Sequence, residues 1–282
     1  MKAPHLFLLD ALMLEDEPAL EAWRAWRAIA NMDRLDAASF RLLPALAARL
    51  EPWLAGDPQR AILTGICRRG WSQAQMRRKV LAEAVSVLAG ADVPAQAAGP
   101  VDWADRYWPA GVMRSIESLN LDVVPADVNR AVETLMQAGW TVEGRSPAGS
   151  WFELRFAPPV RLRNRAGVGV RVHWRGLPNS DVVLPELAGW KARETSAEHD
   201  LVRVLGCEYA DGLHWSCDAA MIGRVSIDWD EVARLLRWHY LAKTRLHEWN
   251  PALVRSIPLG IGERVLTWPL RMYRRIRVAG RH

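Results

Sequence analysis

The sequence predicts an α+β fold in which a short β-rich core lies between two helical regions. Apolar residues recur at helical spacing over roughly the first 90 residues, for example Leu20 with Trp23 and Phe40 with Leu43. Short runs rich in β-branched and aromatic residues then appear between about 92 and 176, and the helical pattern returns from about 187. We therefore expect an N-terminal helical region over 1–91, an α/β core over 92–186 and a C-terminal helical region over 187–282.

The N-terminal region should end in a long basic helix. Pro and Gly in Gly56-Asp57-Pro58 end one helical unit, and the pattern that follows predicts a helix over about 59–88. This helix carries positive charge on more than one face, which favours solvated or ion-paired side chains over a phosphate clamp. These residues are Arg68, Arg69, Arg77, Arg78 and Lys79.

The core region should contain short strands around one helix. The helix follows Pro125, with Asp127 as its expected cap, and ends at Gly139. In the C-terminal region, Ser226 or Asp228 is the expected cap of a further helix. The expected strands are 119–124, 141–142, 151–156, 160–162 and 169–174.

The composition of the chain indicates in which compartment it works and which partners it could bind. Three cysteines among 282 residues are too few for a disulfide framework, which indicates a reducing compartment, and we expect a cytoplasmic protein. No stretch approaches the roughly 18 uncharged apolar residues of a membrane-spanning helix. The net charge of +5 is uneven, because residues 242–282 hold nine Lys or Arg against two acids. That basic tail could lie on an anionic membrane surface through residues 262–282, bind an acidic partner, or pack as a terminal helix.

One predicted strand carries two polar side chains within an apolar run, Ser118 to Pro125. Because side chains alternate faces along a strand, Asn120 and Asp122 point one way and Leu121 points the other. Two carboxylates at this spacing are typical of enzymes that hold Mg²⁺ with a nucleoside triphosphate, but here one of the two is an amide. The alternative is an ordinary solvent-facing pair on a half-buried strand.

This region resembles a known bacterial family in the order and spacing of its motifs. The run Leu119-Asn120-Leu121-Asp122-Val123-Val124-Pro125, then a helix ending in Gly139-Trp140, is similar to the uncharacterised nucleotidyltransferase-like family, whose hallmark is Asp-x-Asp-Leu-Leu-Val-Pro, a helix and Gly-Trp. Residues 41–46 and 65–71 look like the N-terminal helices of that family. Val172-His173-Trp174 looks like its strand Asp-Leu-His-Trp. The resemblance covers about residues 5–240.

The resemblance implies a nucleotidyltransferase-type mixed β-sheet core with three carboxylates that bind two metal ions. In this sequence the three positions hold Asn120, Asp122 and Arg171, so one carboxylate of three is kept. The Leu-Lys-Gly turn of the family falls at Ala97-Ala98-Gly99 and keeps only the glycine. We expect Arg171 to form an ion pair with Asp122 where a metal would sit.

The metal site is therefore degenerate, and three functions in different classes follow. The first is a catalytically impaired binding or accessory protein of a bacterial biosynthetic pathway that needs no cofactor. It would hold an acidic peptide, a protein or a nucleotide through residues Gly99, Arg114, Asn120, Arg171 and His173. The second is an active enzyme that moves a nucleotidyl group from a nucleoside triphosphate to a hydroxyl of a small molecule or peptide, with Mg²⁺ and Asp122 as metal ligand and catalytic residue. The third is a peripheral membrane or partner adaptor acting through the basic tail. We do not expect nucleic acid as a partner.

Overall fold

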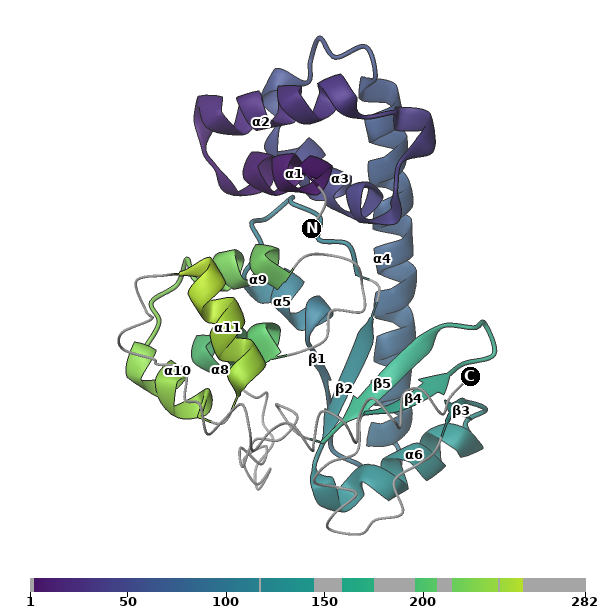
Figure 1. Ribbon diagram of the computed structural model, residues 1–282. Coiled ribbons are helices and arrows are strands. Elements are labelled where there is room, and N and C mark those ends of the chain that lie inside the picture. Colours follow the sequence, from purple (N-terminus) through teal and green to yellow (C-terminus); the bar gives the residue numbers. More distant parts are fainter. Residues whose placement is uncertain are drawn as a thin grey trace. The chain divides into compact units, whose positions relative to one another are not determined.

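A computed structural model describes residues 3–116, 118–144, 159–174, 196–206, 215–237 and 239–250 (Figure 1). The chain divides into two compact units, and each is built from segments that are distant in sequence. Unit 1 comprises residues 1–79, 100–117 and 209–224, and unit 2 comprises residues 80–99, 118–208 and 225–282. Both units therefore cross the boundaries expected near residues 91 and 186.

Unit 1 is helical, and its core is formed by leucine and tryptophan side chains of the first three helices. Its helices are α1 (Ala3–Met13), α2 (Asp16–Ile29), α3 (Ala37–Arg49), the first part of α4 (Arg60–Ala89), α5 (Pro100–Arg106) and α9 (Trp215–Ile222), with short 3-10 turns η1 (Met32–Arg34) and η2 (Glu51–Trp53). Leu8, Leu43 and Leu46 are fully buried in this core, and Trp26 stacks on Trp23 with ring centroids 5.1 Å apart.

Local hydrogen bonds and charge contacts explain where α3 begins and how two arginines of α4 are held. Asp36 caps α3 by accepting hydrogen bonds from the backbone N–H groups of Ala38 and Ser39, both at 3.0 Å. The long helix expected over 59–88 is confirmed as α4. Two of its positive side chains have partners: Arg78 donates two hydrogen bonds to Asp105, and Arg69 lies over the ring of Phe40.

Unit 2 contains a five-stranded mixed sheet in the order β1-β2-β5-β4-β3 (Figure 1). The strands are β1 (Ala95–Ala98), β2 (Leu119–Val123), β3 (Thr141–Glu143), β4 (Val160–Arg163) and β5 (Gly169–His173). Strands β2 and β5 are parallel, and the other neighbours are antiparallel. The remaining elements are the end of α4, the 3-10 turn η3 (Pro125–Asp127), α6 (Val128–Gln137), α8 (Ala197–Gly206), α10 (Trp229–Leu235) and α11 (Tyr240–Trp249).

The α+β class is confirmed, and four of the expected strands correspond to β2–β5. The strand expected over 151–156 lies outside the described residues. The expected cap of α6 is wrong, because Pro125–Asp127 forms a 3-10 turn that leaves Asp127 with ψ near 0° and no side-chain hydrogen bond to the helix. The Asp228 cap is confirmed, because its carboxylate accepts hydrogen bonds from the backbone N–H groups of Asp230 and Glu231.

The sheet has one apolar and one polar face. Leu121 of β2, Val172 of β5 and Val160 of β4 are opposite one another in register, and all three are buried. The alternating positions carry Asn120, Asp122 and the charged residues of β4 and β5. The polar side chains predicted from the motif are thus gathered on one side of the sheet.

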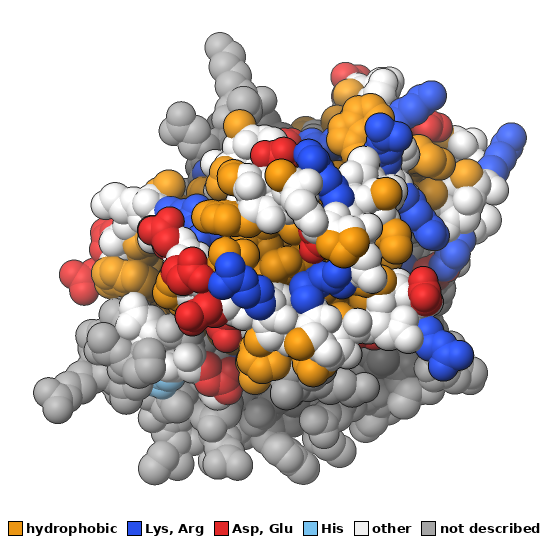
Figure 2. Space-filling view, turned by 90° about the horizontal axis from the view of Figure 1, so that it is seen from above, with side chains coloured by type: hydrophobic (Ala, Val, Ile, Leu, Met, Phe, Trp, Pro, Cys, Tyr) orange, Lys and Arg blue, Asp and Glu red, His pale blue; other side chains and the backbone are white. Residues whose placement is uncertain are grey.

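On the surface, apolar side chains lie among charged ones, as Figure 2 shows for one face of the molecule. The most exposed large apolar side chains include Trp71 and Met76 of α4. Among the described helices, none is long and apolar enough to cross a membrane. The basic tail over 262–282 lies outside the described residues, so its proposed role as an adaptor stays a sequence prediction.

Candidate functional site on the polar face of the sheet

The parallel pairing of β2 and β5 brings four of the sequence-predicted site residues together. Asn120 is opposite Arg171, and Asp122 is opposite His173. Residues opposite each other on neighbouring strands point to the same face of a sheet. The amide, the carboxylate, the guanidinium and the imidazole therefore share one patch, which we call the β2–β5 face.

The β2–β5 face is not an ordinary solvent-facing strand surface. Every residue of β2 is buried, and the side chain of Asp122 is 0 % exposed. The solvent-facing alternative for Asn120 and Asp122 is therefore wrong. A carboxylate removed from water in this way requires a charged or hydrogen-bonding partner.

That partner is Arg203, in the last turn of α8. Its guanidinium donates to both oxygens of Asp122, Nη1 to Oδ2 at 2.7 Å and Nη2 to Oδ1 at 2.5 Å. We expected Arg171 in this role, but Arg203 holds both oxygens of Asp122, and the register sets Arg171 opposite Asn120, two residues from Asp122 along the strand. Arg203 is 81 residues from Asp122 in sequence and is itself buried. A bidentate pair of this geometry is the strongest form of an arginine–carboxylate contact.

His173 contributes a neutral imidazole to the β2–β5 face. Its Nε2 lies 3.1 Å from Oδ1 of Asn120, which can only accept, so the proton is on Nε2. Loss of water around the ring lowers the pKa of His173 to about 3, helped by the positive charges of Arg203 and Arg171 and opposed by Asp122. The ring is therefore uncharged at neutral pH.

Gly99 lies against the amide of Asn120. Its φ of +69° is in the left-handed region, and an added Cβ would come within 2.6 Å of Nδ2 of Asn120. The resemblance places this glycine in the turn that reads Leu-Lys-Gly in the family, and we expected it to help hold a ligand. In the structure, the absence of a side chain at residue 99 makes room for the Asn120 amide.

Arg114 belongs to a different place. It lies in unit 1, where its guanidinium is fully buried and donates to both oxygens of Asp218, at 2.7 and 2.6 Å. The indole N–H of Trp108 donates to the same carboxylate at 2.8 Å. We therefore assign Arg114 to the core of unit 1 and leave it out of the candidate site.

Two residues of the site were not predicted from the sequence. Arg203 is a lone charge within the apolar run Leu201 to Leu205, and such a charge in a helix core is the signal that could have found it. Arg161 is the second: it is exposed on β4 and directly opposite Arg171. Like charges directly opposite each other on neighbouring strands destabilise a sheet, and a bound anion removes that repulsion.

The donor set of the β2–β5 face does not fit Mg²⁺. This ion prefers several oxygen ligands with near-octahedral geometry. The described residues offer one carboxylate, and Arg203 already holds both of its oxygens. No group of three or more His, Cys, Asp or Glu side chains in the described part of the chain could hold a metal ion.

Comparisons of the chain with known protein families, with curated proteins and with solved structures give no match. The function is therefore inferred from the residues of the β2–β5 face.

Proposed function

We propose that this chain is a nucleotidyltransferase-fold protein that has lost the metal-dependent reaction and binds an anionic ligand on its β2–β5 face, as a binding or accessory protein of a bacterial biosynthetic pathway. One observation carries the proposal: the guanidinium of Arg203 holds both oxygens of the single remaining carboxylate, Asp122. An internal cation thus takes the part that a divalent ion takes in an active relative.

Charge favours an anion over a metal ion on this face. Arg203 and Asp122 neutralise each other and His173 is neutral, while Arg171 and Arg161 bring two further guanidinium groups to the same face. At a few ångströms and an effective dielectric constant of about 20, each close approach of like unit charges costs on the order of 4 kcal/mol. A dication would meet that cost, whereas a phosphate or carboxylate group would gain a comparable attraction. Guanidinium groups also match both anions in bidentate geometry.

The active-enzyme hypothesis makes the opposite demand on Asp122. For this carboxylate to hold Mg²⁺ and orient a triphosphate, Arg203 would have to leave it, and a buried guanidinium without its partner is costly. The two hypotheses thus differ in whether a nucleotide needs a divalent ion to bind.

Isothermal titration calorimetry with ATP, GTP, CTP and UTP tests the proposal, each in the presence of Mg²⁺, Mn²⁺ or EDTA. A synthetic oligoglutamate peptide serves as the non-nucleotide anion. We expect saturable binding of at least one of these anions that persists in EDTA. Binding of nucleotides only with a divalent ion, or tight binding of two metal ions by the wild type, would support the active enzyme and contradict our proposal.

Variants locate the binding to the face. Arg161→Gln and Arg171→Gln should each weaken anion binding about tenfold or more, because each removes a charge-assisted hydrogen bond of about 1.5–3 kcal/mol. Arg163→Gln is the matched control, since this arginine is on the same strand as Arg161 but pairs with Glu143 at 2.5 Å. The double variant Asn120→Asp/Arg171→Asp restores two carboxylates beside Asp122 and should gain Mn²⁺ binding. Equal effects of Arg161→Gln and Arg163→Gln would refute the location.

A further inference from the structure

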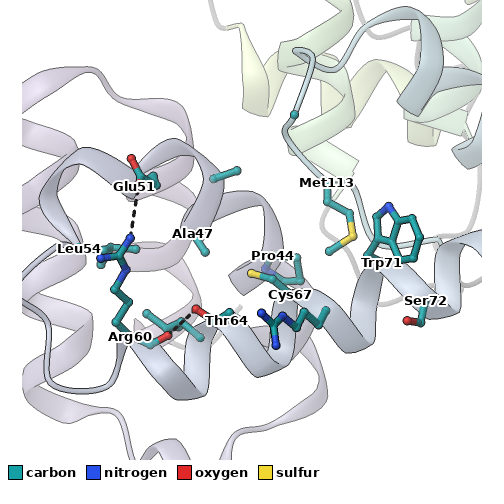
Figure 3. A pocket seen from close by; sticks show the side chains of 14 residues that line it. Pro44, Ala47, Glu51, Leu54, Arg60, Thr64, Cys67, Trp71, Ser72 and Met113 are labelled. Atoms are coloured by element: carbon teal, nitrogen blue, oxygen red, sulfur yellow. Dashed lines mark hydrogen bonds and ion pairs between the residues drawn. The ribbon is translucent and has the colours of Figure 1, made fainter.

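A groove of about 610 Å³ in unit 1 lies between helix α4 and the helices that precede it (Figure 3). We call it the α4 groove. Its floor is one stripe of α4, because the residues that line it recur at intervals of three or four along that helix. These are Arg60, Leu63, Thr64, Cys67, Arg68, Trp71 and Ser72. At 1.5 Å per residue the stripe is about 18 Å long.

The lining of the α4 groove is mostly apolar along this length. Pro44, Cys67 and Met113 lie in its middle, while Trp71 stands toward one end (Figure 3). Burial raises the pKa of the Cys67 thiol, which therefore stays protonated and uncharged at neutral pH. An elongated, mostly apolar groove of this volume is in the size range of small-molecule sites.

The charges of the α4 groove are few and unequal. Arg60 and Glu51, toward the end opposite Trp71, pair at 3.3 Å and offset each other (Figure 3). Arg68 is exposed, and within the described part of the chain it has no ion-pair partner. The groove therefore presents an apolar track with one unmatched positive charge.

We propose that the α4 groove binds an unbranched alkyl carboxylate, with the chain on the apolar track and the carboxylate on Arg68. The long stripe suits an extended chain, and the guanidinium fork of Arg68 matches a carboxylate in bidentate geometry. Two conditions follow: affinity increases with chain length while the chain stays inside the groove, and it requires the anionic head group.

The probes are octanoate, decanoate and dodecanoate at concentrations below micelle formation. Titration calorimetry on the full chain measures the affinity of each. A buried methylene contributes about 0.8 kcal/mol, which is a fourfold change in affinity, and in an open groove we expect about two- to fourfold per methylene. Decanol and decyl phosphate complete the set. Decanoate should bind with one site and at least tenfold more tightly than decanol.

Two variants test the placement of chain and head group. Arg68→Gln should reduce decanoate affinity about tenfold and leave decanol unchanged. Arg69→Gln is the matched control for general charge, because the Arg69 guanidinium lies over Phe40 and is not part of the lining. Ala48→Trp places a large side chain into the groove from an exposed position of α3 and should abolish binding of both ligands.

Alkylation of Cys67 reports occupancy of the groove by a method that does not depend on calorimetry. Decanoate should slow the modification of Cys67, measured on its own peptide by mass spectrometry, and Ala48→Trp should remove this dependence on ligand. Non-saturating binding, equal affinity across the chain-length series, or equal effects of Arg68→Gln and Arg69→Gln would overturn the proposal. Binding of decyl phosphate without decanoate would overturn the choice of a carboxylate.

Discussion

Replacing the buried Arg203 by methionine should destabilise unit 2 strongly. The same replacement of an exposed arginine of unit 2 that makes similar hydrogen bonds should have a much smaller effect. Arg203→Met keeps the length and apolar bulk of the side chain and removes the charge. Asp122 then remains 0 % exposed with two hydrogen bonds of 2.7 and 2.5 Å removed. Breaking one side of a buried pair in this way costs about 3–5 kcal/mol.

Arg234→Met is the control, because Arg234 donates two hydrogen bonds of 2.6 Å to Glu231 in the same unit but in water. Its loss should be small, since exposed pairs are screened and contribute little. The double variant Asp122→Leu/Arg203→Met removes both buried charges and should recover most of the loss, because replacing a whole buried pair by apolar groups is often neutral or stabilising.

Hydrogen exchange of the β2 peptide as a function of urea concentration, followed by mass spectrometry, measures the free energy of opening of the strand itself. This readout separates unit 2 from unit 1, which need not unfold in one transition. The reasoning is refuted if Arg203→Met and Arg234→Met lower the protection of β2 equally. It is also refuted if the effects of Asp122→Leu and Arg203→Met simply add, since coupled residues must show an interaction energy.

Three further changes test the local structure. His173→Gln should make the free energy of unfolding less dependent on pH below neutrality. The pKa of His173 is about 6.5 in the unfolded chain and about 3 in the folded protein, so acidification between these values favours the unfolded wild type. Relative to the variant, the wild type should lose about 1.4 kcal/mol per pH unit, measured by urea unfolding from pH 7 to 4. Gly99→Ala should cost about 1–3 kcal/mol from strain, plus displacement of the Asn120 amide. Gly167→Ala, at a φ of +79° with open space around it, should show the strain alone; equal losses in the two variants would contradict the contact with Asn120. Asp36→Ala should lower the thermal stability of unit 1 by about 0.5–2 kcal/mol and Asp36→Asn by less; an unchanged melting temperature would exclude the cap.

Local sequence patterns predicted the parts of the fold that depend on neighbouring residues. Strand β2 and helix α6 follow from alternation and helical periodicity between Pro and Gly. Strand β1 was not predicted, because Ala95–Ala98 holds no β-branched or aromatic residue; it is defined by its antiparallel pairing with β2.

The site was predictable where a motif sets the register and unpredictable where a distant segment supplies the partner. Asn120, Arg171 and His173 meet because two recognisable strands pair in parallel. Arg203 reaches Asp122 from a helix 81 residues later, and Asp218 reaches Arg114 from 104 residues later. No local pattern records such a contact, because it depends on how helices pack in three dimensions.

The way each unit is assembled from separate segments also affects how this protein can be synthesised. Unit 1 takes its last segment from residues 209–224, whose Asp218 is the buried partner of Arg114 and Trp108. The N-terminal helices therefore leave the ribosome long before the carboxylate that completes their core. At about 5–20 residues per second, the 104 residues from Arg114 to Asp218 take about 5–20 seconds to synthesise. During that time, the carboxylate of Asp218 that pairs with Arg114 has not yet been made, so the core of unit 1 should be completed only after most of the protein has been synthesised.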